Sequence, residues 1–310
     1  MDSVKNMFQF TKYSKVYYLV SGILIIASIA SLIVFKLHFG IEFTGGSNME
    51  VEFIPSTVSG QVNRPGNEQI TKALESFKLG DIVVQPTGDK GAILQFKGID
   101  EATHQNVLAE LTKLSPVEEK SFQFIGPSVG QELKNKTVIA ILLSLLAITL
   151  YIAFAFRKVS RPVASWKYGV TSLIALVHDI LIPLGVFSLL GHFYNVEITI
   201  PIVAALLTIL GFSVHDTIVI FDRIRENILR RGMGEFSQTV DWSLTQTVGR
   251  SISTVATVLI VMFALYFFGG PTLKYFSLAL IIGVSSGAYS SIFIASPLLV
   301  SWNKWSERKT

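Results

Sequence analysis

Long apolar stretches alternate with polar segments along the chain, and they predict six membrane-spanning helices. Each stretch has about 20 residues or more, which is the length that a helix needs to cross the hydrocarbon core of a bilayer. The first stretch is too long for the apolar core of a cleaved signal peptide, so we expect an uncleaved anchor. The predicted spans are Val16–Phe35, Thr137–Phe156, Tyr168–Leu190, Ile198–Phe221, Ser243–Phe268 and Tyr275–Val300.

A segment of mixed polarity, 36–135, separates the first two spans. Alternating or short continuous apolar runs predict strands, and threefold and fourfold apolar spacing predicts helices. The resulting order, βαββαβ, is that of a ferredoxin-like α+β domain. His104, the histidine within this fold, is expected on a solvated helix face. The predicted elements are strand 49–54, helix 67–78, strand 82–86, strand 92–97, helix 100–114 and strand 120–125, with a polar insertion at 55–66.

Composition supports an α-helical polytopic membrane protein. Of the 310 residues, 50% are hydrophobic and 15% are charged, whereas soluble domains carry about 25% charged residues. The chain has no cysteine, which excludes disulfides, thiolate catalysis and cysteine-ligated metals. We expect no cofactor and no metal site.

The basic residues predict the orientation in the membrane. They gather in 157–167, in 222–242 and at the C-terminus, and 191–197 has none. Short loops rich in Lys and Arg stay on the cytoplasmic side, so both termini are expected there. The predicted organisation is a cytoplasmic N-terminus and first span (1–35), an external domain (36–135), a bundle of five further helices (136–300) and a cytoplasmic tail (301–310).

Five ionisable residues lie within the predicted spans, where such residues are costly and usually functional. They are His178, Asp179, His215, Asp216 and Arg250. At a rise of about 1.5 Å per residue, Asp216 lies about 27 Å from the outer end of its helix and Arg250 about 10 Å from the inner end of its own. The two side chains are therefore expected at similar depth.

Arg250 belongs to a polar stripe with spacings of four, three, four and three residues. Such a stripe must face protein or water, because lipid offers it no partners. Two interpretations of the pair with Asp216 stay open: a structural ion pair, or a titratable carboxylate whose cation approaches and withdraws. For His178, Asp179 and His215, structural and functional roles are equally open. The stripe consists of Ser243, Thr247, Arg250, Thr254 and Thr257.

Five motifs together carry a resemblance to a known family. They are GIEFTGG at 40–46, GPSVGQEL at 126–133, HDTIVIFDRIREN at 215–227, SLTQTVGRSIST at 243–254 and FGGPTLKYFSLALIIGVSSG at 268–287. These motifs resemble those of the SecF family, the smaller of the paired SecD–SecF subunits of the bacterial protein translocase. The family is similar to the RND transporters, which also have an external domain after the first of six spans.

The resemblance implies assistance to late preprotein export, driven by protons or sodium ions. It implies that this assistance acts downstream of the SecYEG channel and the SecA ATPase, with SecD, SecYEG and YajC as partners and an unfolded exported polypeptide as substrate. It also implies residence in the cytoplasmic membrane and no role for nucleic acid. The resemblance implies an ion pathway that uses Asp216 and Arg250. Further candidates for this pathway, from their place in the spans, are His215, Asp179, His178, Thr247 and Thr254. His215 departs from the family pattern, where an Asn is frequent.

Three other functions compete with this interpretation. One is an RND-type efflux transporter for small molecules or lipids, although the external domain is small and shows no aromatic-rich cleft. Another is an intramembrane aspartyl protease that uses Asp179 and Asp216, but the expected Gly-x-Gly-Asp pattern is missing around Asp216. The last is a passive scaffold, in which Asp216→Asn would be silent. We expect a transport component without enzymatic activity.

Overall fold

The computed structural model describes residues 8–55, 64–157, 163–231 and 235–308. The chain forms two compact units. The helical unit combines residues 1–38 with 139–310, and the α/β unit comprises residues 39–138.

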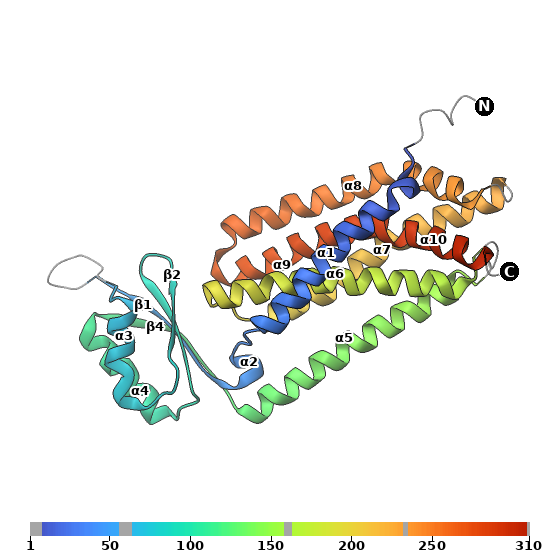
Figure 1. Ribbon diagram of the computed structural model, residues 1–310. Coiled ribbons are helices and arrows are strands. Elements are labelled where there is room, and N and C mark those ends of the chain that lie inside the picture. Colours follow the sequence, from blue (N-terminus) through green and yellow to red (C-terminus); the bar gives the residue numbers. More distant parts are fainter. Residues whose placement is uncertain (1–7, 56–63, 158–162, 232–234, 309–310) are drawn as a thin grey trace. The chain divides into compact units, whose positions relative to one another are not determined.

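Within these ranges, six helices are long and apolar enough to cross a membrane, which confirms the predicted number of spans. The last span is interrupted by a π-helical turn, which the apolar pattern does not reveal (Figure 1). The long elements are α1 (Ser14–Val34), α5 (Pro127–Ala155), α6 (Ser165–Tyr194), α7 (Ile200–Arg231), α8 (Phe236–Phe268) and α9 (Gly270–Ser290), and the turn η4 (Ser291–Ala295) joins α9 to α10 (Ser296–Glu307).

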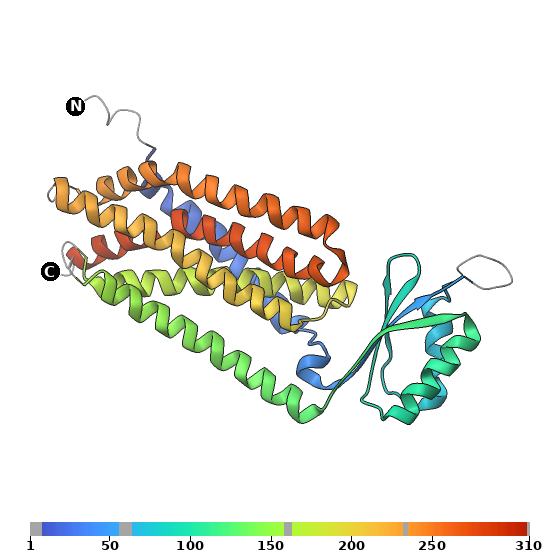
Figure 2. The same ribbon diagram turned by 180° about the vertical axis from the view of Figure 1, so that it is seen from behind.

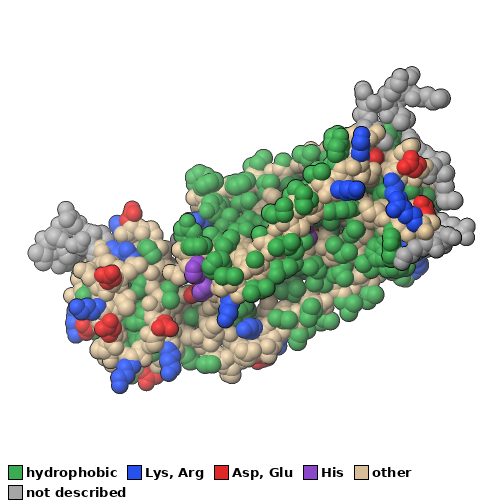
Figure 3. Space-filling view, in the orientation of Figure 1, with side chains coloured by type: hydrophobic (Ala, Val, Ile, Leu, Met, Phe, Trp, Pro, Cys, Tyr) green, Lys and Arg blue, Asp and Glu red, His purple; other side chains and the backbone are tan. Residues whose placement is uncertain are grey.

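The helices divide into an inner and an outer set. Half of the most apolar window of α6 and of α7 is buried within the chain, against 6% for α5 and 11% for α8. The exposed side chains of α5 are mainly leucine, isoleucine and valine, and apolar side chains cover much of the helical unit in Figure 3. Such surfaces suit lipid or an apolar partner, whereas the buried polar groups lie among the inner helices.

Glycines allow the close approach of the inner helices. A Cβ atom on Gly185 of α6 would come within 2.6 Å of the Ser28 Cα atom of α1. On Gly283 of α9, it would come within 2.1 Å of the Ile209 side chain of α7. Larger residues at these positions would force the helices apart.

The helices extend beyond the predicted spans. The segment 222–242, expected as a basic loop, is helical as far as Arg231 and again from Phe236, so that prediction is wrong for most of its length. Ion pairs one turn apart support the extension, such as Arg230 with Glu226 at 2.8 Å, because residues four apart are neighbours on a helix. The predicted tail likewise continues as helix α10 to Glu307.

The α/β unit contains all six predicted elements in the predicted order. Its strands form one antiparallel sheet with the order β2-β3-β1-β4, which Figure 2 shows beside its two helices. Of the predicted polar insertion, 56–63 lies outside the described residues. The elements are β1 (Gly46–Phe53), α3 (Asn67–Leu74) with the 3-10 turn η3 (Glu75–Phe77), β2 (Val83–Thr87), β3 (Gly91–Phe96), α4 (Glu101–Leu114) and β4 (Val117–Ile125).

The helices α3 and α4 pack on one face of this sheet. Alternate residues of β1, namely Met49, Val51 and Phe53, point to the same face and are fully buried. They join Leu74 of α3 and Leu111 of α4 in a single core. The strand period of two and the helix period of 3.6 therefore meet in one apolar layer.

His104 is buried, so its prediction on a solvated helix face is wrong. Only 5% of the residue is exposed. Its ring stacks on Phe122 of β4 with the centroids 3.8 Å apart. Its two ring nitrogens lie 3.2 Å from a Glu101 carboxylate oxygen and 3.1 Å from one of Glu119. The sequence pattern of α4 did not reveal this position, because two of the partners, Glu119 and Phe122, come from strand β4.

The segments that lead into and out of the sheet lie close together within the α/β unit. The short helix α2 (Ile41–Thr44), which the sequence analysis does not predict, leads into Gly45, whose φ is 76°. A Cβ atom on Gly45 would lie 2.7 Å from the Pro127 Cα atom, and one on Gly130 would lie 2.9 Å from the Gly45 nitrogen. Side chains at either glycine would therefore collide with backbone, which only glycine avoids.

Candidate functional site

Asp216 of α7 is buried among hydroxyl groups, and no Lys, Arg or His of the described residues forms an ion pair with it. Its Oδ1 accepts a hydrogen bond of 2.6 Å from Ser251 of α8, and its Oδ2 accepts one of 2.5 Å from Ser291 of η4. The residue is 8% exposed. The carboxyl group thus joins three helical segments that are far apart in the sequence.

Asp179 of α6 is more deeply buried and has more donors. Its side chain is fully inaccessible. The Oδ2 atom accepts from Ser213 at 2.6 Å and from Ser290 at 2.7 Å. The Oδ1 atom accepts from Ser286 at 3.1 Å and lies 2.9 Å from Nδ1 of His178. Four donors are the number that suits the lone pairs of an ionised carboxylate.

The two acids are neighbours through their partners. Ser290 bonds Asp179 while Ser291, the next residue, bonds Asp216. On α7, Ser213 bonds Asp179 and precedes Asp216 by less than one turn. Among the described residues, no single donor bonds both acids. The structure therefore does not bring them together as the shared pair that an aspartyl protease requires.

Arg250 is exposed in this chain and does not contact Asp216 in the structure. In the part of the chain that is described, no carboxylate lies within ion-pair distance of its side chain. The next residue, Ser251, bonds Asp216, so Arg250 and Asp216 lie at nearly the same level along their helices. His215 is also exposed, on the side of α7 away from the buried acids.

The predicted polar stripe of α8 is only partly buried. Ser243 and Thr247 face the protein interior, whereas Arg250 and Thr254 are exposed. Buried positions instead follow the row Ser243, Thr247, Ser251 and Val255. Residues four apart differ by about 40° in their direction around the helix axis. The buried row, with spacings of four, therefore diverges from the predicted stripe, with alternating spacings of four and three, after one or two turns. The hydroxyls of Thr247 and Thr254 bond carbonyls of their own helix.

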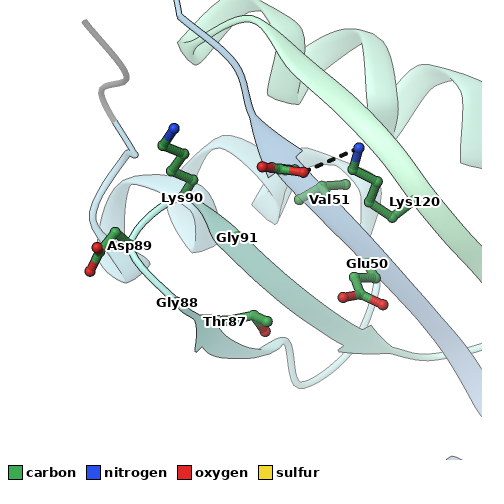
Figure 4. Close-up of a pocket in the computed structure, with 9 residues that line it drawn as sticks. Glu50, Val51, Thr87, Gly88, Asp89, Lys90, Gly91 and Lys120 are labelled. Carbon is green, nitrogen blue, oxygen red and sulfur yellow. Dashed lines mark ion pairs between the residues drawn. The ribbon is translucent and has the colours of Figure 1, made fainter. Parts of the chain in front are cut away.

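A shallow pocket of about 350 Å³ lies in the α/β unit, at the hairpin of β2 and β3 (Figure 4). Its walls mix acidic and basic side chains, and Lys120 pairs there with Glu118 at 3.0 Å and Glu52 at 3.1 Å. Hydrogen bonds to Glu118 and then to Glu52 raise the pKa of the exposed Lys120 ammonium. Two of the charges that line the pocket, Lys120 and Glu52, are thus already paired with each other.

Comparison with known proteins decides the family. Residues 105–305 match the model of the protein export membrane protein SecD/SecF C-terminal family, and residues 30–53 match the SecD/SecF GG motif. The SecF protein translocase subunit of Thermobaculum terrenum is 43% identical over 304 residues, which cover 96% of this chain and 94% of that protein. The chain belongs to the SecF family.

Other SecF relatives agree with this assignment. The SecF protein translocase subunit of Vibrio alginolyticus is 37% identical over 93% of this chain and 88% of its own length. The crystal structure of SecDF, a translocon-associated membrane protein from Thermus thermophilus, matches with a TM-score of 0.83 and 30% identity. The match covers 98% of this chain but 40% of the SecDF chain. This SecF chain is thus a multi-pass membrane protein of protein transport.

Several serines of the SecF site were missed as carboxylate partners by the sequence analysis. The motif of the last span served there only to indicate the family. Serine hydroxyls bond the two acids, and a usable signal was the spacing of four between Ser286 and Ser290. The missed partners are Ser213, Ser251, Ser286, Ser290 and Ser291.

Proposed function

We propose that this SecF chain pairs with a SecD subunit and uses the proton or sodium motive force to assist late preprotein export. The exported chain would be unfolded and would leave through the SecYEG channel of the bacterial cytoplasmic membrane, with YajC as a further partner. Asp216 takes up and releases the ion as the helices change arrangement. Arg250 is the cation that approaches and withdraws.

The observation that carries this proposal is the environment of Asp216. A carboxylate inside a membrane is costly unless a proton or a cation neutralises it. Among the described residues, the hydrogen-bond partners of the Asp216 carboxyl are the hydroxyls of Ser251 and Ser291. Arg250 immediately precedes Ser251 on α8, but its side chain is exposed. A small rotation of α8 would change the distance between the two charges, and with it the affinity of Asp216 for an ion.

A SecD partner is supported by the exposed polar side of α7 and α8. His215, Arg250 and Thr254 are exposed within this chain although they lie in apolar spans. Lipid cannot satisfy such groups, so another protein or water must cover them. A second subunit of similar size would do so and would complete a bundle of helices around Asp216.

The α/β unit is proposed to be a ferredoxin-like domain on the outer side of the membrane. Its order of elements and its antiparallel sheet support the fold, and the distribution of basic residues supports the side. The absence of native cysteine allows a direct test of orientation. In intact cells, Asn195→Cys should react with an impermeant thiol reagent, and Lys304→Cys should react only after the membrane is opened. Reaction of Lys304→Cys in intact cells would reverse the orientation.

The function is tested by export assays in membrane vesicles that contain the complex with its SecD partner. Asp216→Asn and Arg250→Met should assemble normally and lose the ion-driven part of late export. Asp222→Asn is the matched control, because Asp222 lies on the same helix, is 61% exposed and pairs with Arg225. Full ion-driven export by assembled Asp216→Asn vesicles would exclude the carrier role. Loss of assembly in both variants would indicate a structural ion pair instead.

A further inference from the structure

A nitrogen of His178 is buried in the helical unit without a partner. Only 1% of this residue is exposed, so neither lipid nor a second subunit can reach it in this arrangement. Its Nδ1 atom lies 2.9 Å from Oδ1 of Asp179. Its Nε2 atom has no hydrogen-bond partner among the described residues.

The pairing with Asp179 determines which nitrogen is available. An ionised carboxylate can only accept, so Nδ1 of His178 donates to Asp179. In a neutral ring, Nε2 then carries a lone pair and no hydrogen. A proton that binds Nε2 turns the ring into an imidazolium beside a carboxylate, and the pair becomes neutral overall. A buried polar atom without a partner is unfavourable, which is a reason to expect a function for Nε2.

The surroundings of His178 contain few other charges. From α9, Tyr289 stacks near its ring with the centroids 6.2 Å apart. From α7 comes Asp216, less than a turn beyond Ser213. The turn η4 has no titratable side chain, and the charged residues of α1 and α10 lie in the first turn and the second half of those helices. In the described part of the chain, no Lys or Arg pairs with Asp179.

Tyr289, whose ring stacks near that of His178, also bonds the N-terminal half of α1. The Tyr289 hydroxyl donates to the Tyr17 carbonyl at 3.2 Å, and it accepts from Ser21 at 3.5 Å. These bonds hold the Tyr289 ring in place beside His178.

The adjacent serines at the end of α9 link the two acids. Ser290 bonds Asp179 and Ser291 bonds Asp216, at the point where α9 changes into the π-helical turn η4. Such π-helical turns often occur at functional sites. Any shift of this turn moves both hydroxyls together, so a change at one carboxylate alters the hydrogen bonds of the other.

We propose that His178 and Asp179 form a second proton-binding site, which accepts a proton on His178 Nε2 and is coupled to Asp216 through Ser290 and Ser291. The inference deepens the proposed function and rests on it for the role of Asp216. In the binding step, a proton from water joins the Nε2 lone pair, and no other covalent bond changes. On release, the proton returns to water.

The test is ¹⁵N NMR of histidine-labelled full-length chain in lipid nanodiscs with its SecD partner. The chain has five histidines, and the signal of His178 is assigned by its loss in His178→Gln. At high pH, we expect a proton on Nδ1 only, and at low pH a proton on both nitrogens. Asp179→Asn should displace the midpoint of this change by about one pH unit or more, as loss of a charged neighbour does. Asp222→Asn, which removes a distant exposed charge, should not.

The coupling has its own readout. Asp216→Asn should also displace the midpoint of His178, by about one pH unit, the size at which two sites titrate as a pair. The effect should vanish when both Ser290 and Ser291 are alanine. Ser188→Ala is the control, because Ser188 is buried on α6 and bonds only backbone oxygens.

Each other outcome overturns part of the proposal. A His178 signal that keeps one tautomer from pH 4 to pH 9, or a proton on Nε2 at high pH, excludes the proton site, and the unsubstituted chain alone decides this. A midpoint pH of the His178 signal that is the same in Asp216→Asn and in the parent chain excludes the coupling. The NMR signal does not depend on export. It therefore tests this proposal separately from the proposed function, which is tested by the assembly and the export activity of Asp216→Asn vesicles.

Discussion

His104 in the α/β unit and His178 in the helical unit are both buried beside carboxylates, yet they differ in how many carboxylates they contact. Both nitrogens of His104 face carboxylate oxygens, one of Glu101 and one of Glu119. Both nitrogens of His104 are thus engaged by acids. His178 contacts one carboxylate, and its Nε2 atom has no hydrogen-bond partner among the described residues. The number of acid partners, more than burial, therefore distinguishes the two histidines.

The sharpest contrast is expected from removing one acid on each side. Asp179→Ala leaves four buried donors without their acceptor and should destabilise α6 by about 3–5 kcal/mol, the cost of breaking a buried pair. Glu119→Ala should cost about 1 kcal/mol or less in α4 and β4, because the Glu119 side chain is 22% exposed and water can replace it. Amide hydrogen exchange of the full chain measures both. Equal losses would remove the distinction.

The tightness of the serine cage around Asp179 is tested by a methyl group. In Gly287→Ala, the new Cβ would lie 3.0 Å from the Ser213 Cβ, and overpacking of this kind costs about 1–3 kcal/mol. Gly211→Ala on α7 meets nothing within 4 Å, so it should be neutral or slightly stabilising. Thermal unfolding in detergent compares them. If both variants unfold like the parent chain, the cage is looser than the structure indicates.

The contacts of His104 are expected to fasten α4 to β4. His104→Gln removes the ring that stacks on Phe122 and lies 3.1 Å from a Glu119 oxygen. A loss of about 1–2 kcal/mol corresponds to amide exchange that is roughly 5 to 30 times faster in these two elements. Thr112→Ala, on the exposed side of α4, should leave exchange there unchanged. Unaltered exchange in His104→Gln would show that the apolar core alone holds the two elements together.

The smallest effect concerns the exposed acid beside His104. Hydrogen bonds from Gln105 and then from His104 lower the pKa of the Glu101 carboxyl below its usual value of about 4.3. Its contribution to stability is therefore complete above that pH and is lost as the pH falls through the lowered value. Carboxyl ¹³C NMR should show a higher pKa of Glu101 in Gln105→Ala than in the parent chain. No change would show that Gln105 does not hold this carboxylate.

Much of the fold follows from the sequence. Six apolar stretches predict six helices because only a helix satisfies its backbone inside a bilayer, and the elements of the α/β unit follow from periods of two and 3.6. Some predicted helices were too short, as for α7, because the length of an apolar stretch reflects the thickness of the membrane, and the helix can continue beyond it. The π-helical turn η4 was not predicted, because a local change in the backbone hydrogen-bond pattern does not alter the hydropathy of the sequence.

The candidate site was predictable in its acids and not in their partners. Asp179 and Asp216 stand out as charges in apolar runs, whereas a serine in a membrane helix is common and serves many roles. Whether Ser251 or Arg250 faces Asp216 depends on the rotation of α8 by about 100° per residue. That rotation is set by packing against α7 and α9, which lie elsewhere in the chain. Likewise, the contact of His104 with Glu119 could not be predicted from helix periodicity, because Glu119 lies on a strand.

The close approach of Gly45 and Pro127 has a consequence for how this protein can change over generations. Gly46 and Ile125 lie opposite each other in the paired strands β1 and β4, so the chain leaves the α/β unit almost where it enters. A short linker could replace everything between them without stretching the flanking backbone. The geometry therefore allows such an insertion to be lengthened or exchanged without moving the backbone on either side of it.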